Sequence, residues 1–376
     1  MGVPCRYRSM SVERVLWKCE PRTKVKLEIL NRYLGAWFGI LANKGFQGVA
    51  YLDGFCGPGE YEDGEIGSPI IAIQHANAMA ARHPPFSAVI ICIDEDKRNL
   101  THLKSIKDIR KPHPNVRVEI TPGTFESQVI GIFDRYDVPE IWPTFSFIDP
   151  FGFGESPYEI LVPLVRNKSS ELFINFMCGF MNRFKEHHEP AIVDKIRKTV
   201  GSNDLERIIA AEDPINELCQ VYKENLLKIG RHVLTFMMRD QDNVRDNALF
   251  FCGNHARGFE KIKQAMWKVD PIHGNMFSAY KYYQADAGQR KLFPDQAYTE
   301  PLREAILKKY SGHNRVLVCD LNKWTIEQTE TFLPTHLKTE LENLLDKRKI
   351  TYCDPQPTGR KRAKGQWPER LLISFK

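Results

Sequence analysis

The chain has 376 residues, of which 42% are hydrophobic and 27% charged, so it is long enough for a full-sized globular α/β domain and a smaller unit. Because no stretch of about 18 uncharged apolar residues occurs, we expect no transmembrane helix and no membrane partner. The net charge of +6 is concentrated at the ends, since residues 347–376 hold nine Lys or Arg against two acids and residues 1–32 hold eight against three.

From residue 23 onward, helical and strand-like patterns alternate. The continuous apolar run Ser87–Ile93 is typical of a strand buried on both faces. Strands that alternate with helices at these lengths predict an α/β fold with a doubly wound, Rossmann-like parallel sheet over residues 1–290, interrupted by a helical insertion at about 185–230. The predicted strands are 49–52, 87–93, 116–120, 145–148, 171–176, 232–238 and 248–252, and the predicted helices are 23–42, 68–82, 96–107, 123–136, 157–166 and 258–269.

The pattern changes beyond about residue 295. Three helices, followed by two short strands around a loop rich in Gly, Pro, Arg and Lys, predict a basic winged-helix-like domain over residues 295–376. A helical extension with a floppy tail is the alternative, but the apolar end LLISF favours the wing. The predicted helices are 301–310, 324–332 and 334–347, and the predicted strands are 350–353 and 371–375.

The two basic ends on an acidic body indicate a polyanionic partner, most simply nucleic acid. The predicted wing loop carries the densest group of cations: Arg360, Lys361, Arg362 and Lys364. We predict that these side chains project into solvent and contact a phosphate backbone, whereas ordinary solvated surface charge is the alternative. Trp367, just beyond the loop, is expected to pack under the wing rather than to stack on a base.

A glycine-rich turn follows the first predicted strand in the sequence DGFCGPG. Glycines let a backbone turn sharply and approach a ligand closely. The motif lacks the GxGxxG spacing, which disfavours an NAD-dependent oxidoreductase. An acid followed by two glycines suits S-adenosylmethionine (SAM), although a plain tight turn is the alternative. The predicted cofactor-binding residues of this turn are Asp53, Gly54, Phe55, Gly57 and Gly59.

Two later strand ends supply further candidates for cofactor binding. An acid at the end of the second strand can accept both ribose hydroxyls of an adenosine cofactor. Asp94 is the first choice for this role and Glu95 the second, and capping of the helix at 96–107 is the alternative. Thr124 and Phe125 follow the third strand, where folds of this type contact the adenine ring.

The segment FSFIDPFG lies at the end of another predicted strand, where ligands collect in open parallel sheets. Its Asp149, Pro150 and Phe151 resemble the Asp-Pro-Pro-aromatic loop of amino-methyltransferases. The resemblance implies that the acid holds an exocyclic amine and that the ring stacks on the base. The aromatic residue comes one position early here, and Gly152 stands at its usual place.

Three runs together resemble the three-Cys-motif partner proteins (TcmP): PRTKVKLEILNRYLGAW, YLDGFCGPGEYEDGEIGSP and IDPFGFG. This resemblance implies a SAM-binding Rossmann-like core and a radical-SAM-like three-Cys-motif protein as a partner. Family members resemble T-x-x-K-H in the first helix, whereas Leu27 stands here at the position of the His. A looser similarity to ribosomal-RNA adenine-N6 methyltransferases implies that Lys26 lies at the mouth of the active site. A solvated Lys on an amphipathic helix is the alternative.

The nine cysteines form no CxxC pair, which indicates free thiols in a reducing cytoplasm and no zinc or other metal site. The leading hypothesis is a SAM-dependent methyltransferase acting on nucleic acid, at an exocyclic base amine, with Asp149, Pro150, Phe151 and Lys26 in the catalytic site. The second hypothesis is a non-catalytic SAM- and nucleic-acid-binding protein that recruits a radical-SAM-like partner.

Overall fold

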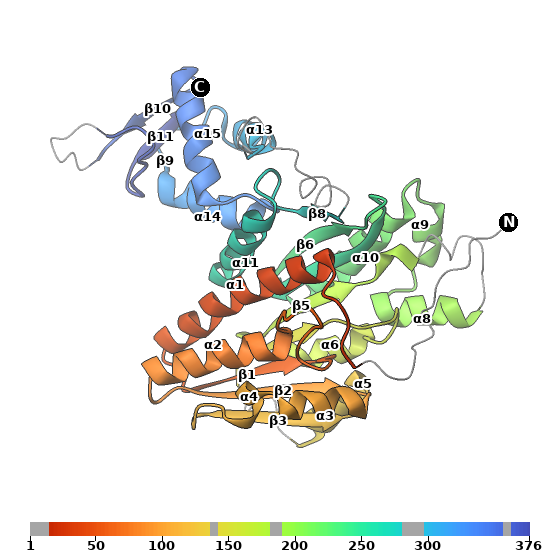
Figure 1. Cartoon of the computed structure of the whole chain (residues 1–376). Coiled ribbons are helices and arrows are strands. Elements are labelled where there is room, and N and C mark those ends of the chain that lie inside the picture. Colours follow the sequence, from red (N-terminus) through yellow and green to blue (C-terminus); the bar gives the residue numbers. More distant parts are fainter. Residues whose placement is uncertain (1–14, 136–141, 181–189, 280–296, 356–361) are drawn as a thin grey trace.

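The computed structural model describes residues 15–135, 142–180, 190–279, 297–355 and 362–376, and Figure 1 shows their arrangement. A large α/β core contains the elements up to Ser278, and a smaller unit contains the elements from Glu300 onward. The domain boundary expected near 290–295 lies outside the described residues, as does the first part of the expected helical insertion.

The strands of the core form an eight-stranded sheet in the order β3-β2-β1-β4-β5-β7-β6-β8 among the described residues. Pairing is parallel throughout except for β7, which runs antiparallel to β5 and β6. The predicted doubly wound sheet is therefore confirmed, and β8 is an addition that the sequence did not indicate. The strands are β1 (Gly48–Asp53), β2 (Ser87–Asp94), β3 (Val116–Pro122), β4 (Thr144–Ile148), β5 (Glu171–Phe176), β6 (His232–Arg239), β7 (Arg245–Gly253) and β8 (Met276–Ser278).

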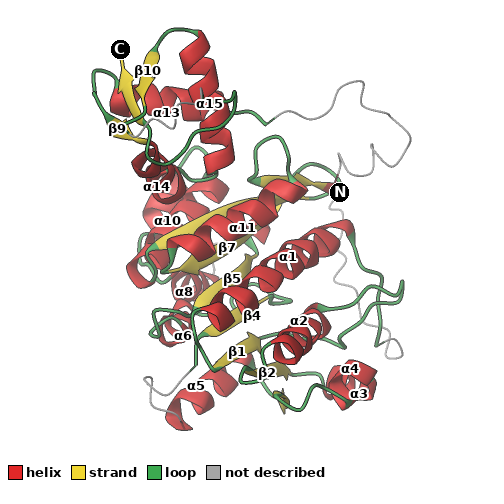
Figure 2. Cartoon of the chain, turned by 90° about the vertical axis from the view of Figure 1, so that its left-hand side faces the viewer, coloured by secondary structure: helices red, strands yellow, loops and turns green. Residues whose placement is uncertain are grey.

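Helices cover both faces of this sheet, as Figures 1 and 2 show. Alternate residues of a strand point to opposite faces, so Tyr51 of β1 joins one apolar cluster and Leu52 joins the other. The first cluster involves α1 (Pro21–Asn43), α2 (Ser68–Arg82), α3 (Lys97–Ser105), α4 (Lys107–Arg110) and α11 (Ala256–Val269). The second involves α5 (Phe125–Arg135), α6 (Tyr158–Leu164), η2 (Cys178–Phe180), α8 (Pro190–Val200), α9 (Leu205–Ala210) and α10 (Pro214–Ile229).

The C-terminal unit has its own apolar core, in which Leu337, Ile373 and Trp367 are buried. Its sheet has the order β10-β11-β9, with β11 antiparallel to both neighbours. The expected burial of Trp367 is confirmed. The elements are α13 (Glu300–Tyr310), β9 (Val316–Leu317), α14 (Val318–Gln328), α15 (Pro334–Asp346), β10 (Ile350–Cys353) and β11 (Leu372–Phe375).

Two expectations for this unit were wrong in detail. The second helix, α14, begins at Val318 and ends at Gln328, several residues earlier than the expected 324–332. The hairpin has a third strand, β9, which pairs with β11 just before α14 begins. The strand is two residues long, and so short a strand leaves no alternation pattern in the sequence.

The two units are joined by contacts between α11 and the end of α14. The Lys263 side chain is fully buried, and its Nζ donates to the carbonyl oxygens of Ile326 at 2.8 Å and Thr329 at 2.6 Å. The indole Nε1 of Trp267 donates to the carbonyl oxygen of Thr331 at 2.7 Å. No helix in the described part of the chain is long and apolar enough to cross a membrane.

Candidate active site

The three predicted motifs meet at one edge of the sheet. Because β1 is parallel to both β2 and β4, its last residue Asp53 stands level with Cys92 and Phe147 in the neighbouring strands. The loops that follow the three strands therefore leave the sheet side by side. Ligands bind at this carboxyl edge in open parallel sheets, so we place the candidate site there.

The glycine turn folds back over the ends of the neighbouring strands. The Gly54 amide donates to the Phe147 carbonyl at 2.9 Å, and the Cys56 amide donates to the Ile93 carbonyl at 2.9 Å. Gly57 and Gly59 have φ angles of +59° and +86°, in the region that side chains rarely adopt. The two glycines allow the tight turn that the sequence predicted.

Two aromatic rings support this turn from the side of α5. A Cβ on Gly54 would lie 2.7 Å from the ring of Phe125, so only glycine fits there. Phe125 is buried, and its ring centroid lies 5.6 Å from that of the half-buried Phe55. Phe125 therefore packs beneath the turn and does not line an open surface. Thr124 is exposed, and its hydroxyl accepts from the Ser127 amide at 3.1 Å at the start of α5.

Asp53 lies beneath the turn, fully enclosed. Its carboxylate accepts from the Tyr51 hydroxyl at 3.0 Å and from the Phe55 amide at 3.4 Å. Burial raises the pKa of Asp53 to about 7, against the opposing effect of hydrogen bonds from Ser68 and Tyr51. The sequence placed this acid near the cationic end of the cofactor, whereas the structure gives it the role of holding the turn in shape.

Asp94 is also turned inward. One carboxylate oxygen accepts from the Gly57 amide at 2.9 Å, and the other accepts from the Asp96 amide at 2.7 Å and the Asn99 side chain at 3.2 Å. Burial raises the pKa of Asp94. Its neighbour Glu95 is exposed at the same strand end. The second choice for the ribose-binding acid is thus the more accessible of the two.

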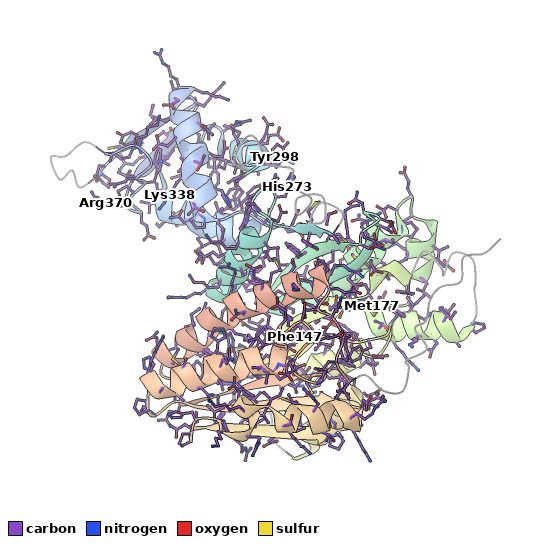
Figure 3. All side chains as sticks on the ribbon, viewed as in Figure 1. Phe147, Met177, His273, Tyr298, Lys338 and Arg370 are labelled. Atoms are coloured by element: carbon purple, nitrogen blue, oxygen red, sulfur yellow. The ribbon has the colours of Figure 1, made fainter. Side chains whose placement is uncertain are left out.

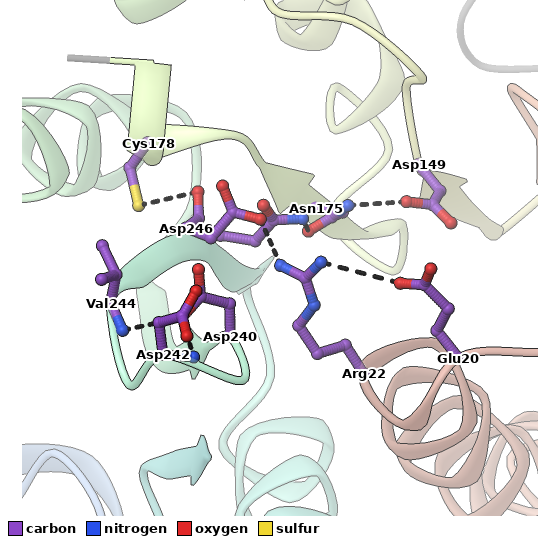
Figure 4. A network of polar contacts seen from close by, with 10 residues as sticks. Glu20, Arg22, Asp149, Asn175, Cys178, Asp240, Asp242, Val244 and Asp246 are labelled. Carbon is purple, nitrogen blue, oxygen red and sulfur yellow. Dashed lines mark hydrogen bonds and ion pairs between the residues drawn. The ribbon is translucent and has the colours of Figure 1, made fainter. Parts of the chain in front are cut away.

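Asp149 and Lys26 form an ion pair at the end of β4. The Lys26 Nζ lies 2.5 Å from one carboxylate oxygen of Asp149, and the other oxygen accepts from the Asn175 amide at 2.7 Å. Figure 4 shows Asp149 and Asn175 in this arrangement. Lys26 is a buried residue of α1, and the Asp149 side chain is 22% exposed. The structure thus brings together two residues that the sequence linked only through a resemblance.

A second group of polar residues lies behind this pair and was not predicted. Arg22, one helical turn before Lys26, makes an ion pair with Asp246 at the start of β7 and approaches Glu20 at 3.7 Å (Figure 4). The adjacent Asn247 places its amide 3.0 Å from that of Asn175. The i, i+4 spacing of Arg22 and Lys26 puts both cations on one face of α1.

Phe151 is the most exposed aromatic ring of the site, at 61%. Its amide donates to Glu155 at 3.1 Å, which fixes the loop after the buried Pro150. The ring lies edge-on to Trp17, at a centroid distance of 6.2 Å. An exposed ring two residues after Asp149 can stack on a planar ligand.

Trp17 connects the Asp149 loop with the glycine turn. Its ring also contacts Tyr61 edge-on at 6.1 Å, and its carbonyl accepts from the Glu62 amide at 2.9 Å. A Cβ built on Gly57 would lie 3.9 Å from the ring of Trp17. Among the described residues it would meet nothing nearer, apart from the residues next to Gly57 in the chain. Gly57 itself is buried, so the free space on this side lies beneath the surface, next to Trp17.

Metal ligation has no support among the described residues, where no group of three His, Cys, Asp or Glu side chains could hold an ion. Of the predicted nucleic-acid-binding residues, Arg360 and Lys361 lie outside the described residues. Arg362 does not project into solvent as expected, because it makes an ion pair with Glu342 and its side chain is only 8% exposed. Lys364 is exposed and lies 4.0 Å from Asp346.

The core has a doubly wound, Rossmann-like sheet in which a single antiparallel strand, β7, lies between β5 and β6. Searches of protein-family models and of curated protein sequences find no match.

Three solved structures illustrate the likeness, which is remote in each. An O-methyltransferase from Bacillus cereus in complex with SAH is 12% identical, with coverage of 59% of this chain and 80% of that one and a TM-score of 0.32. A DUF574 family protein from Streptomyces avermitilis is 11% identical, with coverage of 62% and 84% and a TM-score of 0.34. A Legionella pneumophila protein assigned to DUF519 is 12% identical, with coverage of 60% and 84% and a TM-score of 0.37. These values are too low to say anything about the site.

Proposed function

We propose that this chain is a SAM-dependent methyltransferase that acts on an exocyclic base amine of nucleic acid. The observation that carries the proposal is the position of Asp149. Its carboxylate is held by Lys26 and Asn175 at the carboxyl end of β4, next to the glycine turn and two residues before the exposed ring of Phe151.

The cofactor part of the proposal assigns SAM to the space above the glycine turn. Gly57 would let the methionine part approach the backbone beside Trp17, while Gly59, packed against Leu103, would shape the turn. Glu95 would accept from the ribose hydroxyls, and Thr124 would lie near the adenine. Bound SAM supplies a methyl group that is already activated for transfer, so the protein needs no strong base. Asp53 and Asp94 would act indirectly, by holding the turn in shape.

The acceptor part assigns the target amine to Asp149. A carboxylate that accepts a hydrogen bond from an amine orients the nitrogen lone pair, and the buried Lys26 ammonium holds that carboxylate in place. The ring of Phe151 would stack on the base, which every nucleobase permits. Taking the base out of its stack would bring it within reach of Asp149.

One observation favours a second candidate function, a non-catalytic SAM-binding partner of a radical-SAM-like three-Cys-motif protein. Both carboxylate oxygens of Asp149 already have partners, Lys26 and Asn175. A carboxylate engaged in this way has less capacity to accept from an incoming amine. This second proposal includes membership of the TcmP family, which the sequence resembles.

The nucleic-acid partner belongs to both candidates. The order of helices and strands in the C-terminal unit, with β10 and β11 flanking a long loop, supports a winged-helix-like unit. Such a unit would hold the polymer while the core handles one nucleotide.

Two measurements test the proposed activity. Calorimetric titration with SAM and its demethylated product should give binding, with NAD as the negative control. Transfer of labelled methyl groups to mixed cellular DNA and RNA should occur with the native protein and be lost in Asp149→Ala, which should keep its affinity for the cofactor. Cofactor binding without transfer, even with a three-Cys-motif partner added, would favour the non-catalytic candidate. Binding of NAD but not of SAM would refute both.

A further inference from the structure

The two ends of the C-terminal sheet differ in how their positive charges are paired. Because β11 is antiparallel to β9 and β10, the starts of β9 and β10 share one end of the sheet with the finish of β11. The Phe375 amide donates to the His313 carbonyl, and the Lys376 amide to the Lys349 carbonyl, both at 2.9 Å. The last residue of β10 and the first of β11 pair at the other end, which we call the loop end and where Arg370 lies (Figure 3).

Five exposed cations gather around the first of these ends, and we call them the basic edge. Arg315 precedes β9, and its amide contacts the Ser374 hydroxyl of β11 at 3.3 Å. A second segment, residues 347–349, forms the turn before β10. Lys309 lies at the same end, because the ring of the adjacent Tyr310 stacks on that of Phe375 at a centroid distance of 5.6 Å. The members of the basic edge are Lys309, Arg315, Lys347, Arg348 and Lys349.

The cations described at the loop end, Arg362, Lys364 and Arg370, each have a carboxylate within 4.0 Å, whereas those of the basic edge have no such partner among the described residues. Arg362 pairs with Glu342, Arg370 pairs with Asp354 at 2.9 Å, and Lys364 lies 4.0 Å from Asp346. Within the described part of the chain, no carboxylate makes an ion pair with a member of the basic edge. Burial, and after it the charge of Asp320, raises the pKa of Tyr310, so Asp320 lies within electrostatic reach of this end.

The backbone conformation at two members of the basic edge also indicates that their charge has a role. Arg315 has a φ of +59° and Arg348 a φ of +55°, and only one other non-glycine residue in the described chain, Asn243, has a positive φ. Glycine or asparagine would adopt this conformation at lower cost than arginine. Folding therefore gives no reason for arginine at these positions, whereas a need for positive charge in solvent does.

The helix α15, which precedes residues 347–349, is acidic and not basic. The segment α15 carries Lys338 (Figure 3) against three acids. Two of these acids serve the unit itself, because Glu340 accepts from the Thr299 hydroxyl at 2.6 Å and Glu342 holds Arg362. An acidic helix is repelled by a phosphate backbone. A polyanion would therefore meet the unit at the end of its sheet and not along α15.

We propose that the C-terminal unit binds the phosphate backbone of nucleic acid through the basic edge, and not through Lys364 and Arg370 at the loop end. The proposal rests on the nucleic-acid partner of the proposed function and names the surface that holds it. Contacts of this kind carry little sequence information. The basic edge would thus anchor the polymer, while the core selects the nucleotide.

The test compares two double variants of the full-length protein. In Arg315→Asn/Arg348→Asn, asparagine tolerates the positive φ, so the fold should be kept. The matched control, Lys364→Gln/Arg370→Gln, removes two cations from the loop end. Fluorescence anisotropy with duplex DNA and single-stranded RNA is measured over a series of salt concentrations, and circular dichroism confirms folding.

We expect the basic-edge variant to bind about tenfold or more weakly at 0.1 M salt, and its log–log salt slope on duplex DNA to flatten by about two units, since each phosphate contact contributes about 0.9. The control should bind within about twofold of the native protein.

Normal binding by the basic-edge variant with weakened binding by the control would overturn the assignment and leave the proposed function standing. Failure of the native protein to bind either probe would remove the nucleic-acid partner itself. If polyglutamate bound to the basic edge more tightly than the nucleic acids did, an acidic protein would be the partner instead.

Discussion

The ammonium of Lys26 lies 2.5 Å from the carboxylate of Asp149, so the first helix of the core is tied directly to the loop after β4. The contact closes one side of the candidate site. It is sheltered from solvent, because the Lys26 side chain is only 11% exposed. Partly buried pairs are costly to break one side at a time, since the remaining charge loses its partner.

The first prediction concerns this pair. Lys26→Met should lower methyl transfer by about ten- to a hundredfold, because Asp149, with Asn175 as its remaining partner, is less firmly held in position. Lys26→Arg should recover part of the loss, since a guanidinium can also pair with a carboxylate. Steady-state kinetics should show the change in kcat, with cofactor affinity nearly unchanged. Equal activity in the Met and native proteins would show that the ion pair has no part in catalysis.

The second prediction separates the two acids at the end of β2. Glu95→Gln should weaken binding of the demethylated cofactor by about 1–3 kcal/mol and leave the melting temperature nearly unchanged, because the Glu95 side chain is exposed. Asp94→Ala should lower both cofactor affinity and thermal stability, because the amides of Gly57 and Asp96 lose their acceptor. Calorimetry and thermal unfolding are measured on both variants. A loss of affinity in Asp94→Ala at unchanged stability would indicate that Asp94, and not Glu95, binds the ribose.

The candidate site is predictable from sequence in its location but not in its side-chain directions. Buried strands and glycine turns are local features, and from them alone Asp53, Asp94 and Asp149 are expected at one edge of the sheet. The side-chain directions depend on distant parts of the chain. Asp94 turns inward because the Gly57 amide comes back over the end of β2, and the ion pair between Arg22 and Asp246 joins α1 to β7. No periodicity in a sequence reports such contacts.

The C-terminal unit shows the same limit. Charge counting identifies the basic tail, but it cannot tell which cations have partners. Glu342, on α15, neutralises Arg362 across the core of the unit. Arg315, in contrast, is far from residues 347–349 in the sequence and comes to the same end of the sheet because β9 pairs with β11. A two-residue strand determines the charge distribution of this surface.

The third prediction concerns pH. Glu171 begins β5 at the opposite edge of the sheet, fully buried, and accepts from the Tyr33 hydroxyl at 2.5 Å. Burial raises the pKa of Glu171 to about 7 from an ordinary value of 4.5. Between these values the folded state binds more protons than the unfolded state, so the contribution of Glu171 to stability is lost as pH rises.

Glu171→Gln removes this titration. The unfolding free energy of the variant, relative to the native protein, should therefore increase by about 1–3 kcal/mol between pH 5 and pH 8. Urea unfolding at a series of pH values measures the difference. Glu126→Gln, a change at an exposed acid, serves as the control. A constant difference across this range would mean that Glu171 titrates at its ordinary pKa.

The last prediction concerns the joint between the two units. Lys263 is fully buried in α11, and its ammonium donates to the carbonyls of Ile326 and Thr329, which belong to the last turn of α14 and the residue that follows. Carbonyls at a helix end have no partner within the helix. Lys263 supplies that partner from the neighbouring unit, so its hydrogen bonds stabilise α14 and fix the C-terminal unit against the core.

Lys263→Met fills the same space but leaves these carbonyls without a donor. We expect a loss of about 2–4 kcal/mol in unfolding free energy, since each unsatisfied buried group costs about 1–3 kcal/mol. Burial lowers the pKa of Lys263 to about 7, so the folded state binds fewer protons than the unfolded state from pH 7 to about 10. The deficit of the variant should therefore widen as pH rises through this window. Lys268→Met, an exposed change on the same helix, should stay within about 0.5 kcal/mol of the native protein. Equal stability of the two variants would show that the buried ammonium does not hold the units together.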